Sequence, residues 1–197
     1  MKLRRADSYR GNIADLLAGL LAPIAPVEKG LDFGSGDGWF AGEMLRRGLA
    51  REVVAVDVQR RAELHVEPLL YDGRRLPFAD RSFTLAYSID ALHHCPDPRA
   101  SLRDLLRCTG RFFAIKDHTY RGALGRLTLC LFDEIGNRRF GVPSLYRYQR
   151  AWSWSDWIAA EGFEPVALLH PAPCHDGLLG RASNHLQFVA LWRRAGG

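Results

Sequence analysis

Carboxylate side chains recur in this sequence where short apolar runs end. Asp32, Asp57 and Asp72 lie at the ends of three successive runs, residues 31–33, 53–56 and 65–71. A carboxylate accepts several hydrogen bonds, so it can bind a pair of hydroxyl groups or an ammonium group. These three positions are therefore candidate ligand contacts.

Acidic and histidine residues also follow two later apolar runs. Asp90, His93 and His94 come after residues 83–89, and Asp117 and His118 come after residues 111–115. An imidazole titrates near neutral pH and can take a proton from a hydroxyl group. If the chemistry needs a general base, we expect it among His118, Asp117 and His94.

The same region raises the question of a metal, because His93, His94, Cys95 and Asp97 fall within five positions. A tetrahedral metal site normally draws spaced pairs of ligands that reach around the ion. Two adjacent histidines on a short loop do not converge easily, so we predict no metal site.

Alternating strands and helices must position these side chains. Apolar runs typical of strands alternate with helical patterns at 39–49 and 98–108. Such alternation predicts right-handed crossovers and a mostly parallel sheet covered by helices on both faces. Open sheets of this kind bind ligands at the carboxyl ends of their strands, so the three aspartates should converge on one crevice.

The remaining segments frame that sheet. The pattern predicts an N-terminal helix over 8–21, a helix over 155–160, and final strands over 165–170 and 185–192 joined by a loop rich in proline and glycine. Residues 119–150 break the alternation, and a long insertion after a strand is a candidate lid. Tyr146 and Tyr148 in that insertion are candidate acceptor contacts.

A glycine-rich loop is the strongest local signal, in Leu31-Asp32-Phe33-Gly34-Ser35-Gly36-Asp37-Gly38. Glycines permit positive φ and a close approach of the backbone to a ligand. The dinucleotide motif would need a third glycine where Trp39 stands, and no G-K-[ST] follows to make a Walker loop.

The spacing D-x-G-x-G-x-G instead resembles the first motif of class I S-adenosylmethionine (SAM)-dependent methyltransferases. Residues 76–94 resemble the L-P-F-x-D-x-S-F-D-x-V…LHH stretch of the small-molecule branch of that superfamily, although Thr84 stands where the family usually has Asp. The resemblance covers residues 27–118 well and the remainder only in outline.

The resemblance implies a single methyltransferase domain over 1–197. Its fold would be α/β, a Rossmann-like seven-stranded mostly parallel sheet with helices on both faces, the last strand antiparallel, an N-terminal cap helix within 1–26 and a lid at 119–150. The expected reaction is SN2 transfer of the SAM methyl group to a small-molecule acceptor.

The resemblance also implies a cofactor role for each aspartate. Asp32 would face the ammonium group of SAM, Asp57 the ribose hydroxyls and Asp72 the adenine. The full set of expected cofactor contacts is Asp32, Gly34, Ser35, Gly36, Gly38, Asp57, Val58, Asp72, Gly73, Ser88 and Ile89.

Composition limits the partners. The 197 residues include 27 Lys and Arg against 22 Asp and Glu, and the sequence pI is about 9.3. The arginines are scattered in pairs, which is typical of solvated faces, so we expect no nucleic-acid partner. No C-x-x-C pair occurs and no apolar run approaches the roughly 18 residues of a membrane span, so we expect a cytoplasmic protein with reduced cysteines.

Three alternatives stay open at this point. One is an NAD(P)-dependent oxidoreductase, which the glycine spacing disfavours. The second is a degenerate methyltransferase domain that acts as a partner, and the third is a nucleic-acid methyltransferase, for which Ser88-Ile89-Asp90-Ala91 lacks the expected N-P-P-Y-like tetrapeptide. The acceptor atom and the oligomeric state do not follow from the sequence.

Overall fold

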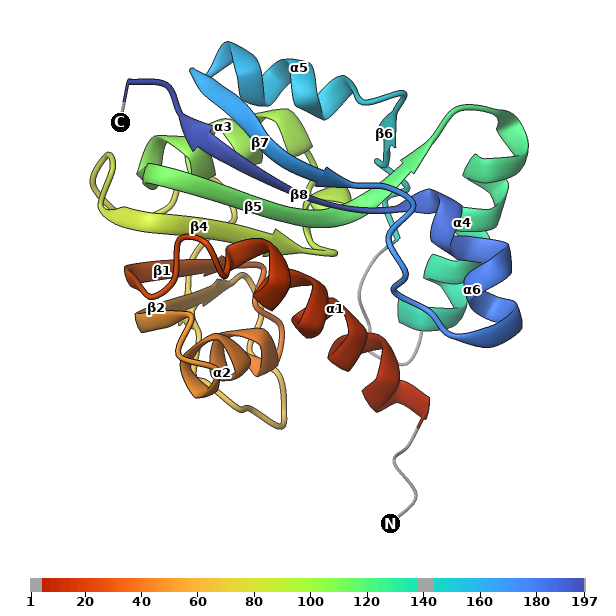
Figure 1. Cartoon of the computed structure of the whole chain (residues 1–197), viewed down its shortest axis with the longest axis horizontal. Coiled ribbons are helices and arrows are strands. Elements are labelled where there is room, and N and C mark those ends of the chain that lie inside the picture. Colours follow the sequence, from red (N-terminus) through yellow and green to blue (C-terminus); the bar gives the residue numbers. More distant parts are fainter. Residues whose placement is uncertain (1–4, 138–143, 197) are drawn as a thin grey trace.

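A twisted, mostly parallel sheet forms the centre of the computed structural model, which describes residues 5–137 and 144–196 (Figure 1). Seven strands follow one another in the order β3-β2-β1-β4-β5-β8-β7, and the short β6 pairs with the end of β5. The bounds are β1 (Val27–Phe33), β2 (Ala50–Asp57), β3 (Leu69–Leu70), β4 (Phe83–Ile89), β5 (Thr109–Tyr120), β6 (Gln149–Arg150), β7 (Phe163–Leu169) and β8 (Gln187–Arg194).

The strand directions confirm the predicted fold class. β3, β2, β1, β4 and β5 run parallel, whereas β8 is antiparallel to both of its neighbours. The short β6, which pairs parallel to β5 at Thr119 and Tyr120, was not predicted. The sheet is therefore Rossmann-like, with the last strand antiparallel.

Helices cover both faces of the sheet (Figure 1). On one face, α1 (Arg5–Leu21) and α2 (Trp39–Arg46) contribute Ile13, Leu17 and Met44 to one apolar core. On the other, α3 (Pro98–Cys108) and α5 (Ser153–Ala160) contribute Leu105 and Trp154 to a second core. Burial of both faces explains why the central strands are almost continuously apolar.

β5 is longer than predicted, and this moves two candidate catalytic residues. We expected the strand to end at Ile115, with Asp117 and His118 on a loop, but both lie within the strand. They are paired across the sheet with Phe188 and Gln187 of β8. The antiparallel partner extends β5 beyond the end of the parallel neighbour β4, a pairing that the local pattern does not reveal.

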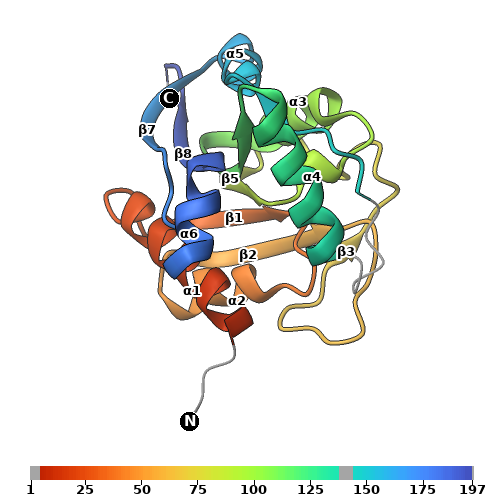
Figure 2. The ribbon, with the colours of Figure 1, turned by 90° about the vertical axis from the view of Figure 1, so that its right-hand side faces the viewer.

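Two helices stand together at one end of the molecule. α4 (Ala123–Asn137) follows β5, and α6 (Gly177–Ser183) precedes β8; both lie at the right of Figure 1 and face the viewer in Figure 2. The sequence predicted a plain loop in place of α6. That helix has only seven residues, and its two leucines are exposed, so it has no amphipathic period. No helix in the described ranges is long and apolar enough to cross a membrane.

Candidate active site

The glycine loop between β1 and α2 has a left-handed backbone at each of its three glycines. At Gly34 a Cβ would lie 2.4 Å from the Ala91 Cβ, and at Gly38 it would lie 2.4 Å from the Val66 carbonyl oxygen. At Gly36, with φ +61°, a Cβ would meet nothing within 4 Å. Two of the glycines therefore permit close packing of the chain, while Gly36 keeps open space beside the loop.

That open space is a cavity of about 710 Å³ at the carboxyl ends of β1, β2 and β4. Ligand pockets for small molecules commonly have volumes of roughly 300–1,000 Å³. Five of the predicted cofactor contacts belong to its wall: Gly34, Gly36, Asp57, Val58 and Gly73. The other wall residues were not predicted as cofactor contacts, and they are Arg10, Phe33, Asp37, Gln59, Arg60, Arg61, Ala62, Glu63, Tyr71, Asp90, Ala91, His94, Cys95 and Pro96.

Asp57 is the acid that this wall presents at the end of β2. Its Oδ2 accepts the Gly36 backbone N–H at 2.8 Å, and its Oδ1 accepts the Gln59 N–H at 3.0 Å. A carboxylate has about four acceptor sites, so each oxygen can still accept another hydrogen bond. Asp57 therefore fixes the glycine loop and can also bind a ligand hydroxyl.

Asp32 does not lie in the cavity wall. Its side chain is buried beneath the loop, accepts the Ala41 backbone N–H, and stands opposite Tyr87 across the β1–β4 pairing. Burial raises the pKa of Asp32 to about 8, so the carboxyl group is largely neutral at pH 7. In this position Asp32 holds the start of α2 to the sheet rather than offering a charge to a ligand.

Asp72 also stays out of the wall. It is exposed, and its Oδ1 accepts the Arg74 backbone N–H at 2.9 Å, which closes its own turn. Of the three aspartates expected to converge, only Asp57 lies in this cavity wall, while Asp32 and Asp72 each accept a hydrogen bond from local backbone. Four further expected contacts likewise lie outside the wall: Ser35, Gly38, Ser88 and Ile89.

A cluster of buried charges lies beside the cavity, where β4 and β5 end. Lys116 is fully buried, and its Nζ contacts Asp90 Oδ1 and the Tyr9 hydroxyl at 2.5 Å each. The Tyr9 hydroxyl donates to Asp90 Oδ2 at 2.8 Å. Burial opposes ionisation of Asp90, but Lys116 and then His118 outweigh it and lower the pKa of Asp90. This carboxylate, which lines the cavity, is therefore ionised.

His93 forms the centre of the same cluster. Its Nδ1 lies 2.7 Å from Asp117 Oδ1, and its Nε2 lies 3.7 Å from Asp133 Oδ1 on α4. Burial alone would lower the pKa of His93, but Asp117 and Asp133 raise it to about 10. The imidazolium is thus charged at neutral pH. The Tyr148 hydroxyl adds a hydrogen bond of 2.5 Å to Asp133 Oδ2.

The pKa of His118 is shifted in the opposite direction to that of His93. Its Nδ1 lies 3.3 Å from Asp117 Oδ1, but burial and the positive charge of Lys116 lower its pKa. A neutral imidazole whose Nδ1–H faces a carboxylate leaves Nε2 as the proton acceptor. The geometry therefore gives His118 the properties of a general base, whereas His93 has those of a fixed cation. Of the three predicted catalytic residues, only His94 lines the cavity.

Comparisons with known proteins assign this chain to a family. A model of the methyltransferase domain matches residues 31–111, which hold the glycine loop, Asp57 and the start of the charge cluster. An uncharacterized methyltransferase of Mycobacterium sp. (strain KMS) is 34% identical over 202 residues, covering 95% of this chain and 74% of that protein. This chain belongs to the class I methyltransferase superfamily.

Two other similar proteins have more specific names, one giving a substrate and the other a cofactor. A demethylmenaquinone methyltransferase of Renibacterium salmoninarum is 27% identical over 165 residues, or 72% of this chain and 69% of that protein. A solved S-adenosylmethionine-dependent methyltransferase of Mesorhizobium loti superposes with a TM-score of 0.64 at 19% identity, covering 92% of this chain and 98% of the other. At that identity the superposition establishes the fold alone.

The methyltransferase also brings potential metal ligands together, although we predicted no metal site. Donor atoms of His93, Asp117 and His118 lie within 4.8 Å of one another, as do those of His93, His94 and Asp133. Hydrogen bonds already account for the first group, because both imidazoles face one oxygen of Asp117.

Two side chains of the buried charge cluster were not among the predicted site residues of the methyltransferase. Lys116 was overlooked, although one charge inside the apolar strand Phe112–Lys116 is a recognisable signal of a buried ion pair. Asp133 was overlooked because nothing in its helix marks it as facing inward. The predicted acceptor contacts, Tyr146 and Tyr148, bond to Glu134 and Asp133 of α4. Arg138 and Arg139 lie outside the described residues.

Proposed function

We propose that this protein transfers the methyl group of SAM to a small-molecule acceptor, and that the cavity beside Gly36 binds the cofactor. The observation that carries the proposal is the pairing of Asp57 with the open face of Gly36 in one cavity wall. Membership of the methyltransferase superfamily supports it, as does the solved relative that is named as SAM-dependent.

The residues present suit SAM. Asp57 retains lone pairs for the two ribose hydroxyls, while its other hydrogen bonds keep it in place. Gly36 leaves room where any other residue would put a Cβ into the cavity. Asp90 is ionised at the same wall and suits the positively charged part of the cofactor better than the largely neutral Asp32 does. When bound, SAM supplies an activated methyl group on its sulfonium.

The protein itself must align the acceptor, exclude water and hold a proton acceptor. We assign the last task to His118, with Asp117 as the positioning residue that orients its ring. His94 lines the cavity and is placed to contact the acceptor. Residues 119–150, which include α4, would form a lid within a single domain that comprises the whole chain. A relative named as a demethylmenaquinone methyltransferase supports a small-molecule acceptor.

Calorimetry with SAM and with S-adenosylhomocysteine tests the cofactor assignment. Asp57→Ala should weaken binding by about 1–3 kcal/mol, because ligand hydroxyls would lose their partner. Asp72→Ala is the matched control, since Asp72 lies outside the wall, and it should bind like the unmodified protein. No binding at millimolar concentration would refute the function, and unchanged affinity of Asp57→Ala would refute the site.

Nitrogen-15 NMR of the imidazoles tests the base. His118 should be neutral at pH 7, because burial and Lys116 lower its pKa, whereas His93 should carry a proton on both nitrogens. A His118→Gln spectrum assigns the signal. A doubly protonated His118 at pH 7 would exclude it as the proton acceptor.

A further inference from the structure

Helix α4 exposes its more apolar side. Its large apolar residues recur at intervals of three and four, which places them on one face of a helix. Their side chains are 56–79% exposed, and they are Leu124, Leu127, Leu131 and Ile135. A helix packed on a globular core shows the reverse arrangement, with its apolar stripe turned inward.

The inner side of α4 is held by few apolar contacts. Leu129 is its one fully buried leucine, and it packs in a small separate cluster with Tyr148 and Leu186. Asp133 faces inward as well, toward the imidazolium of His93. The orientation of α4 is thus fixed by a buried ion pair and a small cluster, and this orientation is what leaves the leucine stripe uncovered.

Helix α6 also exposes large apolar side chains. Leu178 and Leu179 on α6 are 80% and 48% exposed. α4 and α6 lie at the same end of the molecule in both ribbon views (Figures 1 and 2). We call the six exposed side chains of these two helices the apolar end face.

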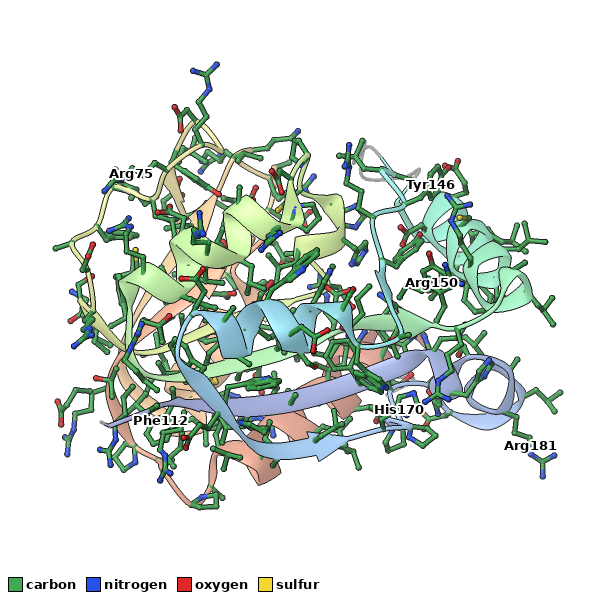
Figure 3. The ribbon with its side chains drawn as sticks, turned by 90° about the horizontal axis from the view of Figure 1, so that it is seen from above. Arg75, Phe112, Tyr146, Arg150, His170 and Arg181 are labelled. Atoms are coloured by element: carbon green, nitrogen blue, oxygen red, sulfur yellow. The ribbon has the colours of Figure 1, made fainter. Side chains whose placement is uncertain are left out.

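Arginines without carboxylate partners occur on α4, on α6 and in the segments that flank α4. In the described part of the chain, no side-chain carboxylate lies within ion-pair distance of five exposed arginines, Arg121, Arg126, Arg147, Arg150 and Arg181. Arg150 and Arg181 stand at this end of the molecule in Figure 3. The two acids of α4 are engaged locally, Asp133 by His93 and Tyr148, and Glu134 by Tyr146.

We propose that the apolar end face docks on an anionic membrane surface. Leucines on one side of a helix with arginines around them suit the boundary between headgroups and acyl chains, where apolar burial and attraction to anionic lipids add. This docking is peripheral and requires no membrane-spanning helix.

A second copy of the chain fits this face less well. A twofold dimer places the same patch on both sides of the interface. The five unpartnered arginines of one copy would then face those of the other, with Glu134 as the one exposed carboxylate of α4 to compensate them. An anionic lipid surface supplies the missing negative charge.

Flotation of the full-length protein with lipid vesicles tests the proposal. Vesicles that contain phosphatidylglycerol and phosphatidylcholine should carry the protein upward, and pure phosphatidylcholine should carry much less. Leu131→Asp should reduce the bound fraction at least about tenfold. Leu168→Asp on β7 is the matched control, because Leu168 is also 56% exposed, and it should float like the unmodified protein.

A charge-reversal pair separates electrostatic from apolar binding. Arg181→Glu at the apolar end face should weaken flotation with anionic vesicles, whereas Arg75→Glu, at the opposite end in Figure 3, should not. Each variant should retain its circular dichroism spectrum and its thermal unfolding transition, controls that need no bound cofactor, so this test is independent of the cofactor proposal. Equal binding to neutral vesicles would overturn the proposal. So would a solution dimer that Leu131→Asp dissociates.

Discussion

Two neighbouring regions at the carboxyl edge of the sheet are built in different ways. The glycine-loop region is centred on one short turn of the chain, where Gly36 has a left-handed backbone and hydrogen-bonds to Asp57 at the end of the neighbouring β2. The buried charge cluster takes its members from α1, the ends of β4 and β5, and α4; His93 and Lys116 are its central cations. A change in the first region should therefore alter ligand affinity, and a change at the buried ion pairs of the second should alter the stability of the fold.

Removal of His93 should give the largest loss of stability. In His93→Gln, Asp117 would stay buried without its cationic partner, which should lower the free energy of unfolding by about 3–5 kcal/mol. Guanidinium denaturation measures this change. His65→Gln changes an exposed histidine and should stay within about 0.5 kcal/mol of the unmodified protein. If His93→Gln lowered the free energy of unfolding as little as His65→Gln does, the cluster would not support the fold.

The same cluster should make stability depend on pH. The pKa of His93 is raised to about 10 in the folded state, from a usual value of about 6.5. A raised pKa adds to the free energy of unfolding, and this contribution is fully present below about pH 6.5. It is lost as the pH rises toward 10, by at most about 1.4 kcal/mol per pH unit. Denaturation at pH 7 and at pH 9 should show this decline, and His93→Gln should flatten it. An identical slope in the variant would contradict the charge assigned to His93.

The glycine loop should respond to substitution through its ligand. Gly36 and Gly48 both have positive φ and open space where a Cβ would stand, so Gly36→Ala and Gly48→Ala should each lower stability by about 1–2 kcal/mol. Gly36→Ala alone should also weaken binding of S-adenosylhomocysteine, because only Gly36 lines the cavity. Calorimetry compares the two variants. Equal affinities would remove Gly36 from the cofactor site.

The contrast between the regions also explains what sequence reasoning could predict. The sequence predicted both ends of β4 (Phe83–Ile89) and of α3 (Pro98–Cys108). The start of α3 is marked locally, because Asp97 caps the helix and Pro98 begins it. Gly36 and Asp57 were predicted as cavity residues, since the loop motif is local.

The charge cluster depends on contacts that no local pattern carries. Lys116 and Asp90 are 26 positions apart, and Asp133 reaches His93 from a separate helix. The length of β5 depends on its antiparallel partner β8, which lies some seventy residues later. Asp32 and Asp72 fit the motif by position, yet each carboxyl group accepts a hydrogen bond from local backbone and neither lies in the cavity wall. Sequence spacing indicates where a strand ends but not which way its last side chain points.

Hydrogen–deuterium exchange with and without S-adenosylhomocysteine tests the central claim most directly. We expect slower exchange of backbone amides in residues 33–38, the loop that contains Gly34 and Gly36 of the cavity wall, and in residues 57–63, which line the cavity, with little change in α4. Unchanged exchange in both segments at saturating ligand, or protection confined to another part of the chain, would contradict a cofactor site beside Gly36 and Asp57.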